Sequence, residues 1–336
     1  MEYLHIIWIT YALFYCCVAY DCPEGCTCYT NNNTSVNCIS ETITSMPQNM
    51  PKNAVFITVE FTNITKLEQN DFSGFLQLQE LHLSDNKLKS IPSGVFRNLS
   101  ELKTLSLFNN FLHDLPMDLF STLFNLTFLT LKGNQLQHIR SEWFTNLKSL
   151  ESLDLSNNII RAVTANIFSS LHNLKTLDMS ENKLEKLPYG LFDDLLSLER
   201  LSLQENHLHS LHSGIFAHLH NLKYLFLEKN KLKQLPSELF KKQKNLDTLQ
   251  VNENYLSSIP EGLFDHLEKL GLEFQQGIDL SLNPWICDCR LLYLWKWLNK
   301  NNSKVYSLTE TRCDLPESLK NMLLTELSEK ELTSAC

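Results

Sequence analysis

One aromatic residue recurs at a fixed interval through most of this chain, and the interval is 24 residues. Nine phenylalanines keep the spacing without a gap: Phe72, Phe96, Phe120, Phe144, Phe168, Phe192, Phe216, Phe240 and Phe264. A fixed period of about 20–50 residues is the signature of a repeat architecture, in which each unit buries its apolar face only against its neighbours. A stack of this kind presents a broad binding surface and offers no deep cleft for catalysis.

The rest of the repeating unit surrounds this phenylalanine. The pattern L-x-x-L-x-L-x-x-N-x-L-x-x-L/I-P-x-x-x-F-x-x-L starts at residue 78 and restarts at 102, 126, 150, 174, 198, 222 and 246, and a weaker first unit starts at Ala54. This unit resembles the 24-residue leucine-rich repeat of extracellular proteins.

Each unit predicts one strand, one turn and one convex segment. The x-L-x-L-x run alternates with period two, so its leucines face the core and its x residues face outward. The asparagine after each strand, from Asn86 to Asn254, can donate and accept for buried backbone groups. We therefore expect an α/β leucine-rich-repeat solenoid with a curved parallel sheet of about ten strands. The sheet forms the concave face, the convex side is irregular or short helical, and disulfide caps close both ends.

Ten cysteines lie outside the repeats and define the ends of the molecule. Cys16 and Cys17 belong to an apolar leader that predicts a signal peptide, and it is too short for a membrane span, which needs about 20 residues. The other eight form two groups of four, and paired cysteines in a secreted chain indicate disulfides more than zinc. The predicted divisions are a signal peptide (1–19), an N-terminal cysteine cap (20–53), nine repeats (54–269), and a spacer, partial repeat and C-terminal cysteine cap (270–336).

Glycosylation signals and charge support secretion into plasma. Asn-x-Ser/Thr sequons occur at Asn33, Asn63, Asn98, Asn125 and Asn301, with Asn32 overlapping the first. The formal net charge is −9, which disfavours nucleic-acid binding and adhesion to anionic membranes.

The predicted concave face is acidic. The third, fifth, seventh and eighth residues of each unit are expected to project onto it. The acids there are Glu60, Glu80, Asp85, Asp154, Asp178, Glu181, Glu205, Glu228 and Glu253, and the bases are Lys132, Arg200 and Lys229. Nine acids against three bases predict a basic partner. The alternative is that these are ordinary solvated positions of a sheet.

Aromatic residues at the same positions supply candidate anchors for a protein ligand. Phe108 and Phe128 fall on adjacent units, Phe56 lies at the N-terminal end, and Tyr224 and Phe226 share one unit. The alternative is cross-strand packing with neighbouring side chains. The candidate ligand-binding residues are therefore Glu60, Glu80, Phe108, Phe128, Asp154, Asp178, Arg200, Tyr224, Phe226 and Glu228.

The sequence gives little support for catalysis, metal binding or a cofactor. His207, His209, His212, His218 and His220 crowd one unit, but their places in the turn and convex part indicate solvated histidines rather than a metal site. Catalytic motifs such as G-x-S-x-G and H-E-x-x-H do not occur. We expect neither an enzyme nor a cofactor-binding protein.

Beyond the repeat, the chain resembles the leucine-rich alpha-2-glycoprotein family over nearly its whole mature length. The similar segments are Gly277-Ile-Asp-Leu-Ser-Leu-Asn-Pro-Trp-Ile-Cys287, Val59-Glu-Phe, and Leu78-Gln-Glu-Leu-His-Leu-Ser84, together with about five extra residues between Leu267 and Ile278. The beta-type phospholipase A2 inhibitor of snake serum is similar in Leu88-Lys-Ser-Ile-Pro-Ser-Gly94 and Cys287-Asp-Cys-Arg-Leu291. The large subunit of carboxypeptidase N is similar in its caps. The complete cysteine sets here depart from the glycoprotein and favour the inhibitor.

The resemblance implies a non-enzymatic secreted protein. The glycoprotein family is associated with cytochrome c binding and with modulation of growth-factor signalling. The inhibitor type captures basic secreted phospholipases A2, and the carboxypeptidase subunit is a non-catalytic carrier. All three functions stay open at this point, as does the oligomeric state. The caps of these families imply the pairings Cys22–Cys28, Cys26–Cys38, Cys287–Cys313 and Cys289–Cys336.

Overall fold

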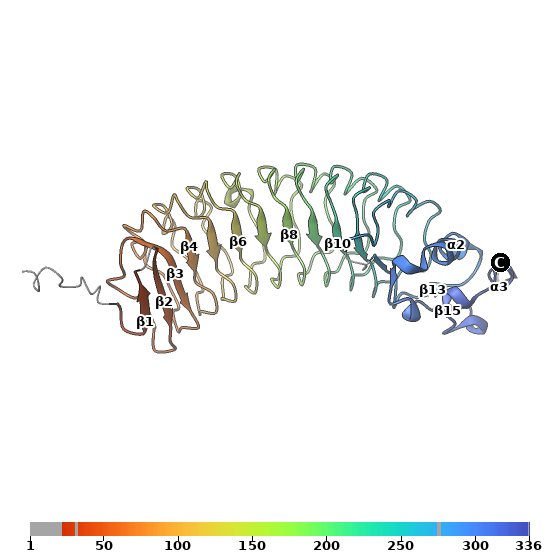
Figure 1. Ribbon diagram of the computed structural model, residues 1–336, viewed down its shortest axis with the longest axis horizontal. Helices are drawn as coiled ribbons and strands as arrows, with labels where there is room; N and C mark the ends of the chain where they lie inside the picture. Colours follow the sequence, from red (N-terminus) through yellow and green to blue (C-terminus); the bar gives the residue numbers. More distant parts are fainter. Residues whose placement is uncertain (1–21, 31–32, 274–276, 335) are drawn as a thin grey trace, which may run out of the picture.

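The repeats stack into one curved solenoid, with a cap at each end (Figure 1). The computed structural model describes residues 22–30, 33–273, 277–334 and 336. The predicted signal peptide and the overlapping sequon at Asn32 lie outside the described residues.

A single sheet runs the length of the solenoid. It has 13 strands, which follow one another in chain order except that β14 replaces β13 at the C-terminal end. The strands are β1 (Cys26–Tyr29), β2 (Thr34–Ile39), β3 (Ala54–Glu60), β4 (Glu80–His82), β5 (Thr104–Ser106), β6 (Phe128–Thr130), β7 (Ser152–Asp154), β8 (Thr176–Asp178), β9 (Arg200–Ser202), β10 (Tyr224–Phe226), β11 (Thr248–Gln250), β12 (Ile278–Asp279) and β14 (Val305–Tyr306). Strands β3 to β12 are the ten that the repeats predict, and the caps add three. β1 and β2 pair antiparallel, and all later pairs in this sheet are parallel.

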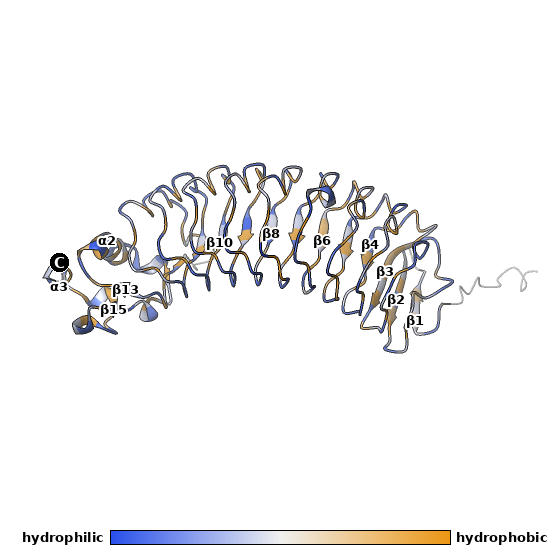
Figure 2. Cartoon of the chain, turned by 180° about the vertical axis from the view of Figure 1, so that it is seen from behind, coloured by the Kyte–Doolittle hydropathy of each residue, from blue (hydrophilic) through white to orange (hydrophobic). Residues whose placement is uncertain are grey.

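Every repeat strand has the same register relative to the next. Leu81 pairs with Leu105, Leu105 with Leu129, and Leu129 with Leu153. Because the chain advances by 24 residues per turn, equivalent positions form straight rows across the sheet. Apolar and polar segments alternate around the turns (Figure 2).

The phenylalanine column fills the side of the core opposite the sheet. All nine members are buried. Neighbouring rings contact one another, with centroids 6.3 Å apart for Phe192 and Phe216 and 6.4 Å for Phe216 and Phe240, both pairs stacked. A single turn would leave its ring exposed, so the stack stabilises each turn through its neighbours.

The predicted asparagine ladder is present and links three successive turns at each step. Asn110 Oδ1 accepts from the backbone N–H of Leu88 at 3.0 Å, and its Nδ2 donates to the carbonyl oxygens of Leu83 (2.9 Å) and Leu107 (3.2 Å). Equivalent bonds recur from Asn86 to Asn254, and Asn283 continues them into the partial repeat. Thr62 takes the asparagine position in the first unit, where its N–H donates to Asn86 Oδ1.

The residue before each ladder asparagine has a left-handed backbone. The φ angles at this eighth position include 53° at Asp85, 53° at Glu181 and 52° at Leu282. Only Gly133 avoids the steric cost of a Cβ there, and that cost is about 1–2 kcal/mol for other residues. The eighth position therefore forms the corner that ends the sheet, where we had expected a position on the face itself.

The convex side is built from turns. Residues 54–269, all of which the structure describes, contain one 3₁₀ helix, η1 (Ser141–Trp143), and no α-helix. The described α-helices lie in the C-terminal cap and are α2 (Leu292–Asn301) and α3 (Glu329–Ser334). Short 3₁₀ helices accompany them: η2 (Cys289–Leu291), η3 (Asn302–Lys304), η4 (Leu308–Glu310), η5 (Glu317–Leu319) and η6 (Leu324–Glu326). In the part of the chain described, we find no helix with the length and apolarity that crossing a membrane requires.

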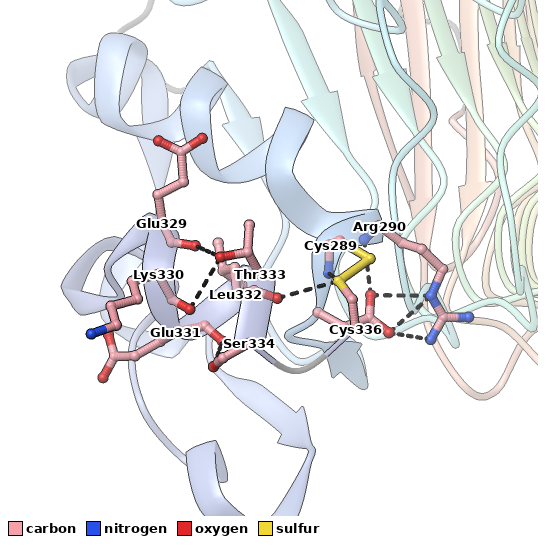
Figure 3. Close-up of a disulfide and its surroundings, with 10 residues drawn as sticks. Cys289, Arg290, Glu329, Lys330, Glu331, Leu332, Thr333, Ser334 and Cys336 are labelled. Atoms are coloured by element: carbon pink, nitrogen blue, oxygen red, sulfur yellow. Dashed lines mark hydrogen bonds and ion pairs between the residues drawn. A yellow bond between two sulfur atoms is a disulfide. The ribbon is translucent and has the colours of Figure 1, made fainter.

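Four disulfides close the two ends. Cys22 is bonded to Cys28 and Cys26 to Cys38 in the N-terminal cap. In the C-terminal cap, Cys287 is bonded to Cys313, next to the small parallel sheet of β13 (Trp285–Ile286) and β15 (Cys313–Leu315). The bond between Cys289 and Cys336 attaches the end of the chain beyond α3 to η2 (Figure 3). These are the pairings that the family resemblance implies.

Candidate ligand-binding face

Side chains at the third, fifth and seventh positions of each repeat point away from the core. We call the surface that they form the sheet face. In β7 and β8 the central leucines are buried, while the flanking Ser152, Asp154, Thr176 and Asp178 are partly exposed. The sheet face is the surface that the sequence predicts to be concave.

Two acids lie side by side at the middle of this face. Asp154 on β7 pairs with Asp178 on β8, so adjacent strands about 4.8 Å apart carry like charges in register. Burial raises the pKa of Asp154 above its ordinary value, the bonds from Ser156 oppose this, and the charge of Asp178 adds to the rise. A cation placed between the two carboxylates would relieve their repulsion.

The same aspartates also hold the backbone, a role that we did not predict. Asp154 Oδ1 accepts from the N–H of Ser156 at 2.9 Å, and Asp178 Oδ1 accepts from the N–H of Ser180 at 2.9 Å and from its Oγ at 2.6 Å. The Asp-x-Ser sequence is the signal that could have shown this, because an Asp side chain often accepts a bond from the N–H two residues on.

An aromatic and cationic cluster lies on the next strands. Asp178 pairs with Ser202 on β9, and Ser202 pairs with Phe226 on β10, so Phe226 is two strands from Asp178 in the same row. The Arg200 guanidinium lies over two rings, with Cζ 4.3 Å from the Phe226 centroid and 5.9 Å from that of Tyr224. This arrangement orders an otherwise exposed arginine through cation–π attraction.

Phe128 extends the area in the other direction. It begins β6 and pairs with Ser152 on β7, and its side chain is 37% exposed. The candidate residues on β6 to β10 thus form one continuous area, which we call the central patch, made of Phe128, Asp154, Asp178, Arg200, Tyr224 and Phe226.

Glu228 follows β10 and borders the central patch. Burial raises its pKa to about 7, partly offset by its own backbone N–H and by Lys229, while Glu205 and Asp279 add to the rise. Its Oε2 is buried without a hydrogen-bond partner, as are Gln204 Oε1 and Asn252 Oδ1 at the same position of the neighbouring turns. Near pH 7 this carboxyl therefore carries about half a charge, so it is a weaker steering group than its sequence position implies.

The spacer after the last full repeat covers one corner of the sheet face. The backbone N–H of Glu273 donates to Asp247 Oδ1 at 2.8 Å, and Tyr224 donates from its hydroxyl to Glu273 Oε2 at 3.3 Å. Thr248, at a third position that would otherwise be exposed, is fully buried. The spacer thus limits the face beside Tyr224, although its residues 274–276 lie outside the described part.

The other candidate residues lie away from the central patch. Phe108 lies two residues beyond the end of β5, while Phe128 pairs with Thr104 at the start of β5. Four residues of strand separate the two rings, or roughly 13 Å, so they do not form one anchor. Glu60 ends β3, and Glu80 on β4 lies 3.5 Å from His82 Nε2 on the same strand.

The histidine-rich unit does not form a metal cluster. His209 Nδ1 bonds to the Glu185 carbonyl at 2.7 Å, His218 pairs with Asp193 at 3.0 Å, and His212 packs edge-on against Tyr189. Among the residues that the structure describes, no three His, Cys, Asp or Glu side chains are grouped to hold a metal ion.

Sequence comparison identifies the repeat type. A family model described as a leucine rich repeat matches residues 56–112 and 100–160, and one described as a BspA type leucine rich repeat region matches residues 137–271 in six copies. The chain is a leucine-rich-repeat protein. These matches span the repeats from β3 to the residues just beyond β11.

Several curated leucine-rich-repeat proteins are similar over part of their length. Leucine-rich repeat-containing protein 3 of Danio rerio is 33% identical over 107 residues, which is 31% of this chain and 40% of that protein. The phospholipase A2 inhibitor of Gloydius brevicaudus siniticus is 45% identical over 67 residues, and the phospholipase A2 inhibitor beta of Elaphe climacophora is 43% identical over 67 residues. Each inhibitor match covers 20% of both chains. The chain thus spans less than half the length of these relatives.

Solved structures share the fold. A chain from an octameric complex of Latrophilin 3, Unc5D and FLRT2 superposes with a TM-score of 0.75, at 23% identity, and covers 94% of this chain and 100% of that one. A leucine-rich-repeat protein of Leptospira interrogans gives a TM-score of 0.57 at 26% identity, covering 74% of this chain and 67% of that one.

Proposed function

We propose that this leucine-rich-repeat protein is secreted and captures a basic protein ligand on the central patch of its sheet face. The observation that carries the proposal is the pairing of Asp154 with Asp178 in adjacent strands, flanked by the exposed aromatic side chains Phe128 and Phe226. Negative charge steers a basic ligand toward the face, and the aromatic rings supply contact area once it arrives.

The first ligand to test is a basic secreted phospholipase A2. Two relatives named as phospholipase A2 inhibitors match this chain at 43–45% identity over 67 residues, and the sequence resemblance in the caps points the same way. Basic charge is the property that the acidic central patch would recognise. Cytochrome c and a growth-factor receptor system are the ligands that the alpha-2-glycoprotein resemblance suggests, and they serve as comparison arms.

The experiment measures association of the purified protein with immobilised basic phospholipase A2 and with cytochrome c at low and physiological salt. Lipid hydrolysis is followed in parallel. We expect salt-sensitive binding of the phospholipase with loss of hydrolysis. Binding without loss of hydrolysis would remove the inhibitor role, and binding of cytochrome c alone would favour the glycoprotein role. No binding of either would contradict the proposal.

The variant for this test is Asp154→Asn combined with Asp178→Asn. Asparagine removes both charges but keeps an oxygen that accepts from the serine N–H groups, so the backbone stays capped. We expect the association rate at low salt to fall by about tenfold. The matched control, Glu101→Gln with Glu142→Gln, removes two exposed charges from loops outside the sheet face and leaves the rate unchanged. Equal effects of the two double variants would show that net charge, and not this patch, governs capture.

A further inference from the structure

A hollow of about 460 Å³ lies where the first turns leave the sheet. Its lining includes Phe61 and Phe111, whose side chains are 55% and 43% exposed, and Asn63. Asp85, Lys87 and Asn109 supply polar groups around these rings. Two exposed aromatic rings in one hollow form an apolar surface that water covers poorly, which is typical of a binding site.

Phe61 is unusual for its position. It occupies the left-handed corner after β3, with a φ of 54°. The equivalent corners at Asp85, Asn109 and Gly133 hold residues that tolerate this conformation better. The ring is exposed, so it gains no core packing in return. A strained and exposed aromatic residue indicates a contact that the protein chain alone does not supply.

Asn63 lies two residues after Phe61 and begins the sequon Asn63-Ile64-Thr65. Its Nδ2 donates to the carbonyl oxygen of Glu41 at 2.6 Å, which fixes the side chain at the rim of the hollow. Glycosylation replaces one amide hydrogen and leaves the other, so this bond can persist in the modified protein.

We propose that the hollow seats the first N-acetylglucosamine of a glycan on Asn63, with one apolar face of the sugar against Phe61 and with Phe111 as the second wall. The ring C–H groups of a sugar carry partial positive charge, and the face of an aromatic ring is negative, so the two attract while both lose water contact. Asp85, Lys87 and Asn109 are placed to bond the hydroxyl and acetamido groups.

The covalent step is the ordinary one of the secretory pathway. A bond forms between Asn63 Nδ2 and sugar C1, one amide hydrogen leaves as a proton, and the lipid diphosphate that carried the sugar is the leaving group. The inference shares with the proposed function only the entry of the chain into that pathway, and it places no demand on the ligand of the central patch.

The test begins with the full chain secreted from mammalian cells and trimmed enzymatically to one sugar per site. Mass spectrometry of the glycopeptides gives occupancy at Asn63. With ¹³C-labelled N-acetylglucosamine, we expect one set of sugar proton resonances to be shifted upfield by the ring current of Phe61. Phe61→Ala should return those resonances to ordinary positions without loss of occupancy.

A thermal unfolding cycle gives a second readout. Thr65→Val abolishes the sequon while keeping Asn63 and its bond to Glu41, and we expect it to lower the melting temperature by about 2 °C. In the Phe61→Ala background the same change should have no effect. Asn98→Gln removes a glycan from another surface and should not depend on Phe61.

Three outcomes would overturn the inference. They are an unmodified Asn63, sugar resonances that Phe61→Ala leaves in place, and a Thr65→Val effect that is the same with and without Phe61. Capture of the basic ligand by the Thr65→Val protein distinguishes the two proposals. Capture should persist if the central patch is the ligand site, whatever the fate of the glycan.

Discussion

Arg200 on β9 lies flat over the ring of Phe226 on β10, with its Cζ 4.3 Å from the ring centroid. The contact places a positive charge inside an otherwise acidic surface and fixes the ring beneath it. Arg200 should therefore oppose a basic ligand through its charge and assist it by holding Phe226 in position.

The two effects separate in binding kinetics. We expect Arg200→Gln to raise the association rate of a basic ligand several-fold at low salt, because a repulsive charge is removed. Arg200→Lys keeps the charge and should leave that rate unchanged. Phe226→Ala should weaken affinity by about tenfold, mainly through faster dissociation. A surface plasmon resonance series over salt concentration measures these effects, and an unchanged affinity for Phe226→Ala would remove the ring from the site.

Asp178 should be needed for stability as well as for binding. Asp178→Ala removes the acceptor for the N–H and Oγ of Ser180, and we expect a loss of about 1 kcal/mol in the free energy of unfolding. Asp178→Asn retains an acceptor and should lose much less. Urea denaturation of the two variants decides the matter, since equal losses would mean that charge and not the bond stabilises the turn.

Glu228 should make stability fall as pH rises. Its folded pKa of about 7 exceeds the ordinary 4.5, so the folded protein keeps a proton that the unfolded chain loses. The associated stability is fully present below about pH 4.5 and is lost as pH rises through 7, at a cost of at most about 3 kcal/mol. Glu228→Gln should therefore be more stable than the parent at pH 8 and equal to it near pH 4. Parallel pH profiles of the two proteins would refute the shifted pKa.

The asparagine ladder should be costly to interrupt. Asn158 Oδ1 accepts from the N–H of Leu136, and Nδ2 donates to the carbonyls of Leu131 and Leu155. Asn158→Ala leaves these buried groups without partners, and we expect a loss of about 3 kcal/mol or more. Asn166→Ala changes an exposed asparagine on the convex side and should alter stability little. Denaturant unfolding compares them, and similar midpoints would contradict the ladder's role.

The left-handed corners offer a gain in stability. Glu181 has a φ of 53° and an exposed side chain, so Glu181→Gly should relieve the clash of its Cβ. We expect an increase of about 0.5–1 kcal/mol after the entropy cost of glycine is subtracted. Glu185→Gly, at an exposed position outside these corners, should instead destabilise. A lower melting temperature for Glu181→Gly would show that its side chain has a contact worth more than the strain.

The repeat core could be predicted from sequence because one spacing rule governs it. The phenylalanine column, the strand leucines and the asparagine ladder each serve the same physical need in every turn, so a pattern of residue types suffices. The ten repeat strands appear where that pattern places them. The cap strands β1, β2 and β14 follow no such period, and their addition to the sheet could not be counted in advance.

The candidate site was harder to predict because it depends on relations between rows. Phe108 and Phe128 belong to neighbouring units, but they occupy opposite ends of the strand direction. The spacer breaks the period, so no rule showed that Glu273 would bond to Tyr224 and that Thr248 would be buried. Asp154 and Asp178 were expected as surface charges, and only their bonds to the following serines reveal that they also support the turn.

The asparagine ladder has a consequence for how such a chain can change in length. Each asparagine reaches the carbonyl of the preceding turn 27 residues back and accepts an N–H 22 residues back, and these separations are the same from Asn110 to Asn254. Inserting one whole unit of 24 residues would reproduce every bond in the new turn. An insertion of half a unit would leave donors and acceptors facing nothing. Lengthening of the binding surface is therefore quantised, and a gene that duplicates one complete unit gains one more strand without solving any new packing problem.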